Sequence, residues 1–268
     1  MAFKKQTYIT PFGVGQSFAI LATLFIVSIP ISLIAGIIMS KIPAAKSWIM
    51  LASYALQFVC TLAAVMIWHK QRNFDTEKFP IVIIPIAILL TISLSVISDA
   101  LVALIPMPDV IARMFADAVS LDLAGYLTVG VIAPVLEEML FRGVILAALL
   151  RYYKPAKAII WSAVIFGIAH LNPWQFIAAF IVGCAIGWIF WKTRNIWVGI
   201  AMHWVNNTVS FAISCTTDDI NVSVYDLMGS PQTYVALIVA SIIVAIVCYK
   251  LIIKLIPITA YTEESSEY

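Results

Sequence analysis

The sequence predicts an all-α protein, a polytopic membrane helix bundle of about eight transmembrane helices with both termini in the cytoplasm. Of its 268 residues, 63% are hydrophobic and only 11% are charged, whereas soluble domains carry about 25% charged residues. Apolar runs of about 20 residues, the length needed to cross a bilayer, recur along the chain. We therefore expect a single integral-membrane domain over residues 1–268, in the plasma (cytoplasmic) membrane if the source is bacterial.

Eight apolar segments are expected to form the helices, and loop residues separate each from the next. In chain order they are Val14–Met39, Ser47–Trp68, Pro80–Ile105, Gly125–Leu150, Ala156–Leu171, Trp174–Trp191, Ile196–Cys215 and Thr233–Leu255. The first is too long for the apolar region of a signal peptide, so it is kept as part of the mature protein. The fifth and sixth are separated only by Asn172-Pro173, a helix-stopping pair.

The longer connections carry acidic residues. The loop 106–124 contains three aspartates among apolar residues and is expected to form a short interfacial helix, whereas 216–232 is expected to be a polar loop. The last residues, 262–268, form a short acidic tail, which we expect to be disordered.

The distribution of lysine and arginine predicts the orientation. An inside N-terminus leaves three cationic residues in outer loops, namely Lys41, Lys46 and Arg113. Twelve then lie on the cytoplasmic side: Lys4, Lys5, Lys70, Arg72, Lys78, Arg151, Lys154, Lys157, Lys192, Arg194, Lys250 and Lys254. The positive-inside rule favours this arrangement. No basic run long enough to bind nucleic acid is present, and the four scattered cysteines indicate neither a disulfide framework nor a zinc cluster.

Three charged residues lie within the fourth apolar segment. Each of Glu137, Glu138 and Arg142 costs at least about 2.5–3.5 kcal/mol at bilayer depth, so each requires a partner. Glu138 and Arg142 are four residues apart and can pair on one helix face. Glu137 points about 100° away and needs a different partner, for which two intramembrane histidines are the candidates.

Two further polar clusters lie in later helices. His170 ends the sequence Phe166-Gly167-Ile168-Ala169-His170, and His203 shares a helix face with Asn207. Counted from the cytoplasmic helix ends at about 1.5 Å per residue, His170 lies about as deep as the glutamates, Asn207 slightly less deep, and His203 about 10 Å shallower. We expect all three clusters to meet in one polar pocket, with Pro134 kinking the helix that carries the glutamates.

The chemistry available to such a pocket is activation of water. Glu137 with His170 can deprotonate water for attack on a peptide carbonyl, while His203 and Asn207 stabilise the oxyanion. Alternatively, His170 and His203 with a glutamate could hold a divalent metal such as zinc. Each of these residues taken singly also fits a structural role: a buried ion pair, a satisfied core histidine or a helix–helix contact.

The three motifs, EExxxR at Glu137–Arg142, FxxxH at Phe166–His170 and HxxxN at His203–Asn207, together resemble the CPBP family, which comprises CAAX prenyl endopeptidases of the Ras-converting type and bacterial Abi relatives. The resemblance covers about residues 125–215 and implies an intramembrane endopeptidase acting on a membrane-associated or lipidated protein or peptide. It implies catalytic roles for Glu137, His170, His203 and Asn207, with Glu138 supporting and Arg142 and Phe166 structural or orienting.

Two other functions compete with this interpretation. Buried Glu, Arg and His also mark ion paths in transporters, but the first, second and sixth helices are expected to contribute almost no polar groups to such a path. A non-catalytic membrane scaffold or bacteriocin-immunity-type protein could also retain the motifs. The substrate and the oligomeric state are left open.

Overall fold

The computed structural model describes residues 11–70, 73–217, 219 and 221–256, and these residues fold almost entirely into helices. The long ones are α1 (Val14–Lys41), α2 (Lys46–Trp68), α3 (Ile83–Val102), α8 (Pro155–Ala169), α9 (Pro173–Thr193), α10 (Ile196–Thr217) and α12 (Pro231–Leu255). A further helix over Leu123–Leu149 comprises α5 (Leu123–Tyr126), η2 (Leu127–Ile132), α6 (Ala133–Glu138), η3 (Met139–Leu146) and α7 (Ala147–Leu149). Three short helices, η1 (Pro43–Ala45), α4 (Asp109–Ala118) and α11 (Val224–Met228), lie in the connections.

The predicted all-α membrane class is confirmed, and each of the eight expected segments coincides with a helix. Among the described residues, five helices are long and apolar enough to cross a membrane, or six if the bent pair of α4 and Leu123–Leu149 forms one span. At 15 residues, α8 is shorter than the span of about 20 that a bilayer requires. The protein is therefore a multi-pass integral membrane protein, and the number of eight spans stays a prediction.

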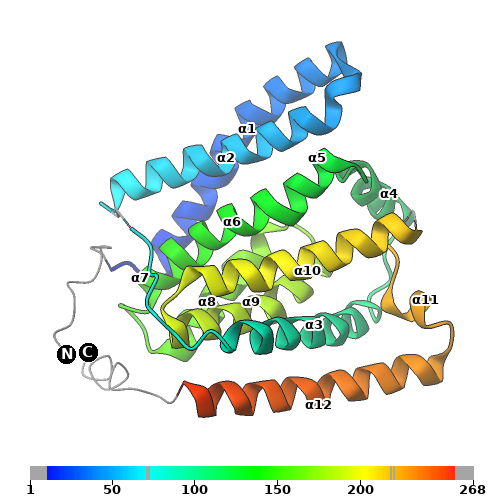
Figure 1. The fold of residues 1–268 in the computed structure, drawn as a ribbon. Helices are drawn as coiled ribbons and strands as arrows, with labels where there is room; N and C mark the ends of the chain where they lie inside the picture. Colours follow the sequence, from blue (N-terminus) through cyan, green and yellow to red (C-terminus); the bar gives the residue numbers. More distant parts are fainter. Residues whose placement is uncertain (1–10, 71–72, 218, 220, 257–268) are drawn as a thin grey trace.

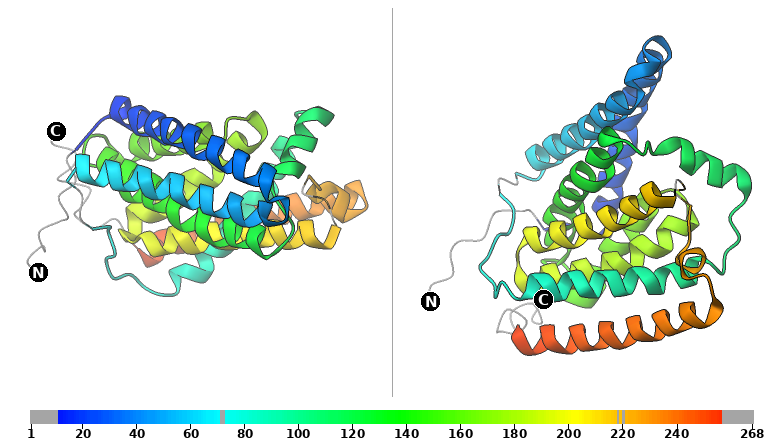
Figure 2. Two further views of the ribbon diagram at one scale, coloured as in Figure 1. Left: turned by 90° about the horizontal axis from the view of Figure 1, so that it is seen from above. Right: turned by 45° about the vertical axis from the view of Figure 1, so that its right-hand side comes forward.

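The helices form a bundle from which the α1–α2 hairpin diverges (Figures 1 and 2). Helix α12 lies at the opposite edge and packs mainly on α3, while α8 and α9 pack on each other. One hydrophobic core surrounds η3 and α8, and a second lies among α3, α9, α10 and α12. Large apolar side chains of α1, such as Ile29 and Leu33, point outward, as expected for a helix that faces lipid.

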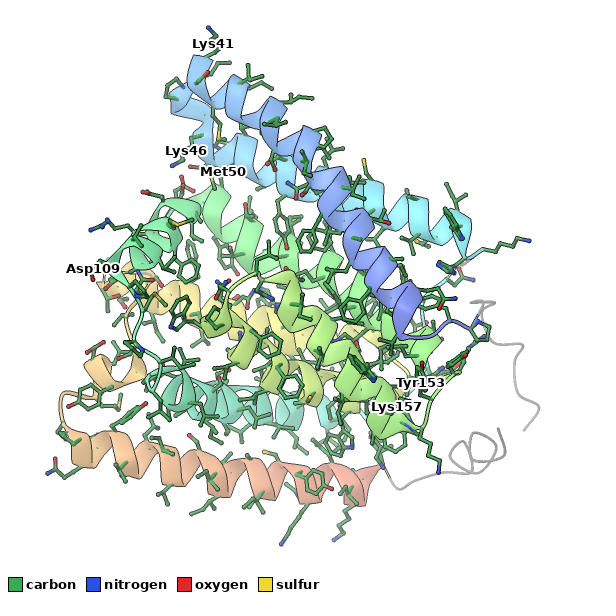
Figure 3. The ribbon with its side chains drawn as sticks, turned by 180° about the vertical axis from the view of Figure 1, so that it is seen from behind. Lys41, Lys46, Met50, Asp109, Tyr153 and Lys157 are labelled. Atoms are coloured by element: carbon green, nitrogen blue, oxygen red, sulfur yellow. The ribbon has the colours of Figure 1, made fainter. Side chains whose placement is uncertain are left out.

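The cationic residues lie at opposite ends of the molecule. Figure 3 shows Lys41 and Lys46 at the tip of the α1–α2 hairpin, and Lys157 beside Tyr153 at the other end of the bundle. This separation matches the one that the charge distribution predicted, and the orientation in the membrane stays a prediction. Lys4, Lys5, Arg72 and the acidic tail 262–268 lie outside the described residues.

The two long loops contain short helices. The expected helix in 106–124 is α4, which has no buried residue and meets the helix Leu123–Leu149 at 97°. In 216–232 we expected only a polar loop, but the structure contains α11, so this prediction was wrong. Its N-terminus is a capping box in which Ser223 and Asp226 each accept the other's backbone N–H. A Ser-x-x-Asp signature was therefore the missed signal.

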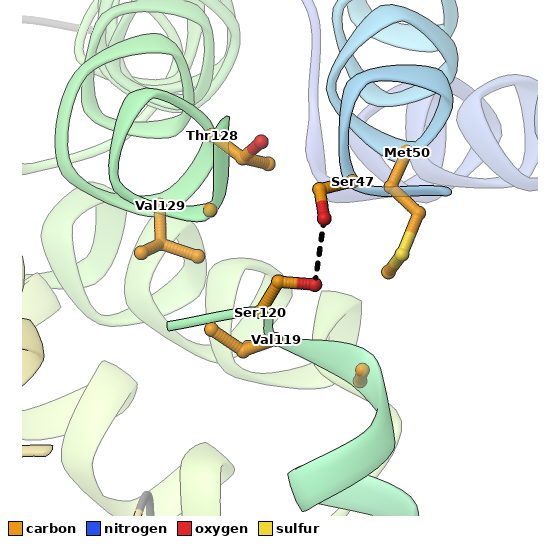
Figure 4. Close-up of a pocket in the computed structure, with 8 residues that line it drawn as sticks. Ser47, Met50, Val119, Ser120, Thr128 and Val129 are labelled. Atoms are coloured by element: carbon orange, nitrogen blue, oxygen red, sulfur yellow. Dashed lines mark hydrogen bonds between the residues drawn. The ribbon is translucent and has the colours of Figure 1, made fainter. Parts of the chain in front are cut away.

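The start of α5 is held by a tight turn against α2. The side chain of Asp122 accepts the Gly125 N–H at 2.8 Å, and hydrogen bonding from the Ser47 hydroxyl, followed by that from Gly125, keeps the pKa of Asp122 below its ordinary value. Ser47 and Ser120 also join their hydroxyls at 3.1 Å beside a small pocket of about 20 Å³ (Figure 4). This turn fixes the start of the helix Leu123–Leu149, which carries Glu137 and Glu138 and is called below the helix of the glutamates.

Gly125→Ala is expected to destabilise this turn, because an added Cβ would lie 1.7 Å from the Ser120 carbonyl oxygen. Overpacking of this kind costs about 1–3 kcal/mol, which would lower the melting temperature of the detergent-purified protein. Gly36→Ala is the matched control, since a methyl group added there would meet nothing within 4 Å. Equal melting temperatures for the two variants would contradict the prediction.

The glutamates lie between two π-helical segments, η2 and η3. In η2 the Ala133 N–H bonds to the carbonyl of Thr128, five residues back, just before Pro134, which has no N–H to donate. Such widened turns occur frequently at functional sites. The distortion expected at Pro134 is therefore seen as a change from α-helical to π-helical winding on both sides of α6.

Candidate active site

Glu138 is the most buried charged residue of the site. Its side chain is 0% exposed, and its Oε1 accepts hydrogen bonds from Arg142 Nη1 at 2.8 Å and from His203 Nδ1 at 2.9 Å. The pair expected from the four-residue spacing is therefore confirmed. Because an ionised carboxylate can only accept, His203 carries a proton on Nδ1. Its Nε2 is the nitrogen left to face the rest of the site.

Arg142 contacts two neighbouring helices within the bundle. It is 1% exposed, and its Nη2 donates to the Gly183 carbonyl of α9 at 3.2 Å. Its guanidinium also lies 4.5 Å from the centroid of the Phe166 ring, a favourable cation–π contact. Glycine at 183 allows this approach, since a Cβ there would lie 3.2 Å from Nη2. Arg142 thus ties the helix of the glutamates to α8 and α9.

Phe166 is the aromatic residue around which the cluster packs. Its ring meets His170 at 5.1 Å and His203 at 5.8 Å between centroids, both in edge-to-face geometry. It also packs against Phe141 at 5.0 Å. These contacts separate the two histidines and fix the plane of each ring.

Glu137 faces away from this ion pair, as the helical geometry predicted. Its Oε1 accepts a hydrogen bond from the Tyr54 hydroxyl of α2. Its Oε2 is buried, has no hydrogen-bond partner among the described residues, and lies 3.9 Å from His203 Nε2. Sequence reasoning sought the partner of Glu137 among the histidines and missed Tyr54. The available signal was a phenol in the middle of a predicted span.

His170 lies where α8 ends. Its Nδ1 donates to the Phe166 carbonyl at 3.0 Å, and its Nε2 has no hydrogen-bond partner in the part of the chain that the structure describes. The next residue, Leu171, has a φ of 58°, a left-handed conformation that is costly for a non-glycine residue. Asn172 stabilises this reversal, because its side chain accepts the Gln175 N–H at the start of α9 and donates to the His170 carbonyl.

Glu137 and His170 line the same cavity, which has a volume of about 290 Å³. Its walls come from α1, α2, the helix of the glutamates and the end of α8: Leu24, Phe25, Ser28, Tyr54, Gln57, Phe58, Glu137, Phe141, Phe166, Ala169, His170 and Leu171. The expectation that the first two helices contribute almost no polar groups was wrong, since Ser28, Tyr54 and Gln57 all reach the cavity. The lining does not include Asn207 or His203, but His203 Nε2 lies 3.9 Å from Oε2 of Glu137, which does line the cavity.

Asn207 lies one turn beyond His203 and is fixed by a chain of side-chain amides. Its Nδ2 donates to the Val129 carbonyl at 2.8 Å, and its Oδ1 accepts from Asn206 Nδ2 at 3.1 Å. The Oδ1 of Asn206 in turn accepts from the Ser95 hydroxyl of α3. These hydrogen bonds identify which atom of the Asn207 amide is the nitrogen. They use one of its two N–H groups, so the second N–H can donate elsewhere.

His203 lies deeper relative to the glutamates than the count of residues suggested. The estimate of about 1.5 Å per residue placed it about 10 Å shallower, yet it bonds directly to Glu138. One physical reason is that η3 lies between Glu138 and the cytoplasmic helix end, and a π-helical turn takes up more residues than an α-helical one. Helix tilt, which the estimate did not include, acts as well.

The donor set does not fit a metal centre. No group of three or more His, Cys, Asp or Glu side chains that could hold a metal ion occurs in the part of the chain that the structure describes. No step below is therefore assigned to a metal.

Comparison with known proteins finds relatives of the segment that carries the three motifs. Residues 119–209 match the family model "Type II CAAX prenyl endopeptidase Rce1-like". The chain is also 33% identical over 78 residues to the proposed membrane peptidase YdiL of Bacillus subtilis (strain 168). That alignment covers 29% of this chain and 32% of the relative. No solved structure matches the chain significantly. The segment that carries all three motifs is therefore similar to the CAAX prenyl endopeptidases, and the chain spans about a third of the length of the curated relative it matches.

Proposed function

We propose that the protein is an intramembrane endopeptidase that hydrolyses a peptide bond of a membrane-associated or lipidated protein or peptide. The observation that carries the proposal is the cavity of about 290 Å³, whose lining includes both Glu137 and His170. The family match of the motif region supports it, because the matching model is that of an endopeptidase. The largely apolar remainder of the lining suits a polypeptide segment that arrives from the lipid phase.

Glu137 is the general base of the proposed reaction. Its Oε1 is occupied by Tyr54, so the buried, unpartnered Oε2 is the atom that accepts a proton from water. The resulting hydroxide forms a bond to the carbonyl carbon of the substrate. His170, whose Nε2 has no hydrogen-bond partner among the described residues, orients this water from the lining of the same cavity. When the tetrahedral intermediate collapses, the C–N bond breaks and the proton held by Glu137 passes to the leaving amine.

The developing oxyanion needs hydrogen-bond donors fixed in advance. We assign these to His203 and Asn207, in keeping with the family resemblance. His203 is oriented by Glu138, and in its doubly protonated form it donates from Nε2, which lies 3.9 Å from Glu137 Oε2, beside the atom that activates water. Asn207 is oriented by Asn206 and Val129 and contributes its second N–H. Arg142 and Phe166 hold this arrangement in place, and Phe166 also lines the cavity.

The proposal is tested by searching for new protein N-termini. Membranes from cells producing the wild-type chain or Glu137→Gln would be compared by mass spectrometry of labelled N-termini. We expect a set of termini, within or next to membrane segments, that is present only with the wild type. Identical sets would overturn the proposal and favour a scaffold or immunity-type protein. Solute flux into proteoliposomes that depends on Glu137, without any cleavage, would favour a transporter.

Cleavage is expected to persist when divalent metals are removed, because the described residues offer no metal-binding group of three side chains. The purified protein would be dialysed against a strong chelator, and the rate of cleavage of the bond identified above would be measured. We expect the rate to stay within about twofold of the untreated enzyme, since Glu137 itself supplies the base. Loss of activity that zinc restores would contradict this prediction.

A further inference from the structure

Tyr54 is a polar residue of the site that lies outside all three motifs and contacts Glu137 directly. It projects from α2, which belongs to the hairpin that diverges from the rest of the bundle (Figure 2). Its hydroxyl donates to Oε1 of Glu137. Its ring packs at 5.0 Å on that of Phe58, one turn later in α2, and both rings line the cavity. The phenol is therefore held in place by packing as well as by the hydrogen bond.

This contact makes the two oxygens of Glu137 different. Oε1 is occupied by the phenol, whereas Oε2 is buried, lacks a hydrogen-bond partner among the described residues and faces His203 Nε2 at 3.9 Å. A glutamate side chain has three rotatable bonds, and an unrestrained carboxylate would present either oxygen in several orientations. A hydrogen bond to one oxygen removes that freedom and leaves the other oxygen aimed at the remaining polar groups.

We infer that Tyr54 is a positioning residue that orients the carboxylate of Glu137 and reserves Oε2 for water. The inference rests on the proposed function, because it requires Glu137 to act as the base. It extends the working site to the α1–α2 hairpin, which the family match over residues 119–209 does not include. Tyr54 acts through Glu137, and no contact with the reacting bond is assigned to it.

The other polar and charged groups around Glu137 remain in place in a Tyr54→Phe variant; they are His203 of α10, His170 of α8, and Glu138 and Arg142 of its own helix. A change in the turnover of this variant would thus report the loss of this one bond.

The test is the variant Tyr54→Phe, which removes one oxygen and keeps the ring. Full-length protein in proteoliposomes would cleave the bond found by N-terminal mass spectrometry, and kcat and KM would be measured. We expect kcat to fall by about 10- to 100-fold, as misplacement of a catalytic group does. KM should change less than about twofold, because Tyr54 contacts Glu137 and no contact with the reacting bond is assigned to it.

Tyr126→Phe is the matched control. It makes the same change at a hydroxyl that lies 3.4 Å from Thr208 and away from the cavity, and it should leave kcat and KM unchanged. If Glu137→Gln is inactive but Tyr54→Phe matches the wild type in kcat, the inference is overturned and the proposed function stands. A wild type that cleaves no membrane protein overturns both. A fall in kcat accompanied by a comparable rise in KM or by a lower melting temperature also overturns the inference, because a general structural effect explains it.

Discussion

Glu137→Gln is expected to reduce peptide-bond cleavage by about 10²–10⁴-fold, the contribution usual for a general base. The amide keeps the shape of the side chain and can still accept the Tyr54 hydrogen bond through its oxygen. The atom at the place of Oε2 becomes an NH₂ group, which cannot take a proton from water. The rate would be measured in proteoliposomes on the bond identified by mass spectrometry.

The control for this variant is Glu77→Gln, which makes the same substitution at an exposed residue. Its rate should equal that of the wild type. Melting temperatures of both variants should lie close to that of the wild type, which separates lost chemistry from lost folding. Cleavage by Glu137→Gln at the wild-type rate would show that another group activates the water, and would remove the basis of the proposed mechanism.

Arg142→Met is expected to destabilise the protein by about 3–5 kcal/mol, the usual cost of leaving one member of a buried ion pair without its partner. Glu138 is 0% exposed and would retain only the hydrogen bond from His203. The thioether has similar length but can donate no hydrogen bond to Glu138 or to the Gly183 carbonyl. Thermal unfolding of the purified protein in detergent would measure the loss.

Two further variants sharpen this prediction. Arg113→Met removes an exposed arginine of α4 and should leave the melting temperature unchanged. The double variant Glu138→Gln with Arg142→Met should be more stable than Arg142→Met alone, because it no longer buries an unpaired charge. If Arg142→Met melted like the wild type, the Glu138–Arg142 pair would not be a structural element of the site.

The helices and the buried Glu138–Arg142 pair could be predicted from the sequence because they depend on local features. The segment Ser47–Trp68 was predicted within one residue of α2 (Lys46–Trp68), since its apolar run is bounded by polar residues at both ends. The pairing of Glu138 with Arg142 followed from helical spacing alone. A short helix within a loop was harder to predict, and α11 was missed because its capping box was not recognised.

Only part of the site could be predicted from the sequence. The sequence indicated that Glu137 needs a partner, but it offered no means to choose Tyr54 over the histidines, because that choice depends on how α2 is rotated. Similarly, a count of residues along two helices misplaced His203, which bonds to Glu138. The depth of His203 relative to the glutamates depends on the winding of η3 and on the tilt of each helix. Neither can be inferred from the apolar pattern.

By itself, the sequence determined the membrane class, the order of the helices and the identity of the charged groups within them. It could do so because the cost of placing charge in lipid and the spacing of residues on one helix face act over a few neighbouring residues. Only the tertiary structure decided that Tyr54 holds Glu137, that His203 meets Glu138, and that α1 and α2 close the cavity. Each of these contacts joins helices far apart in the chain, and their rotation and tilt are set by the packing of whole helix faces.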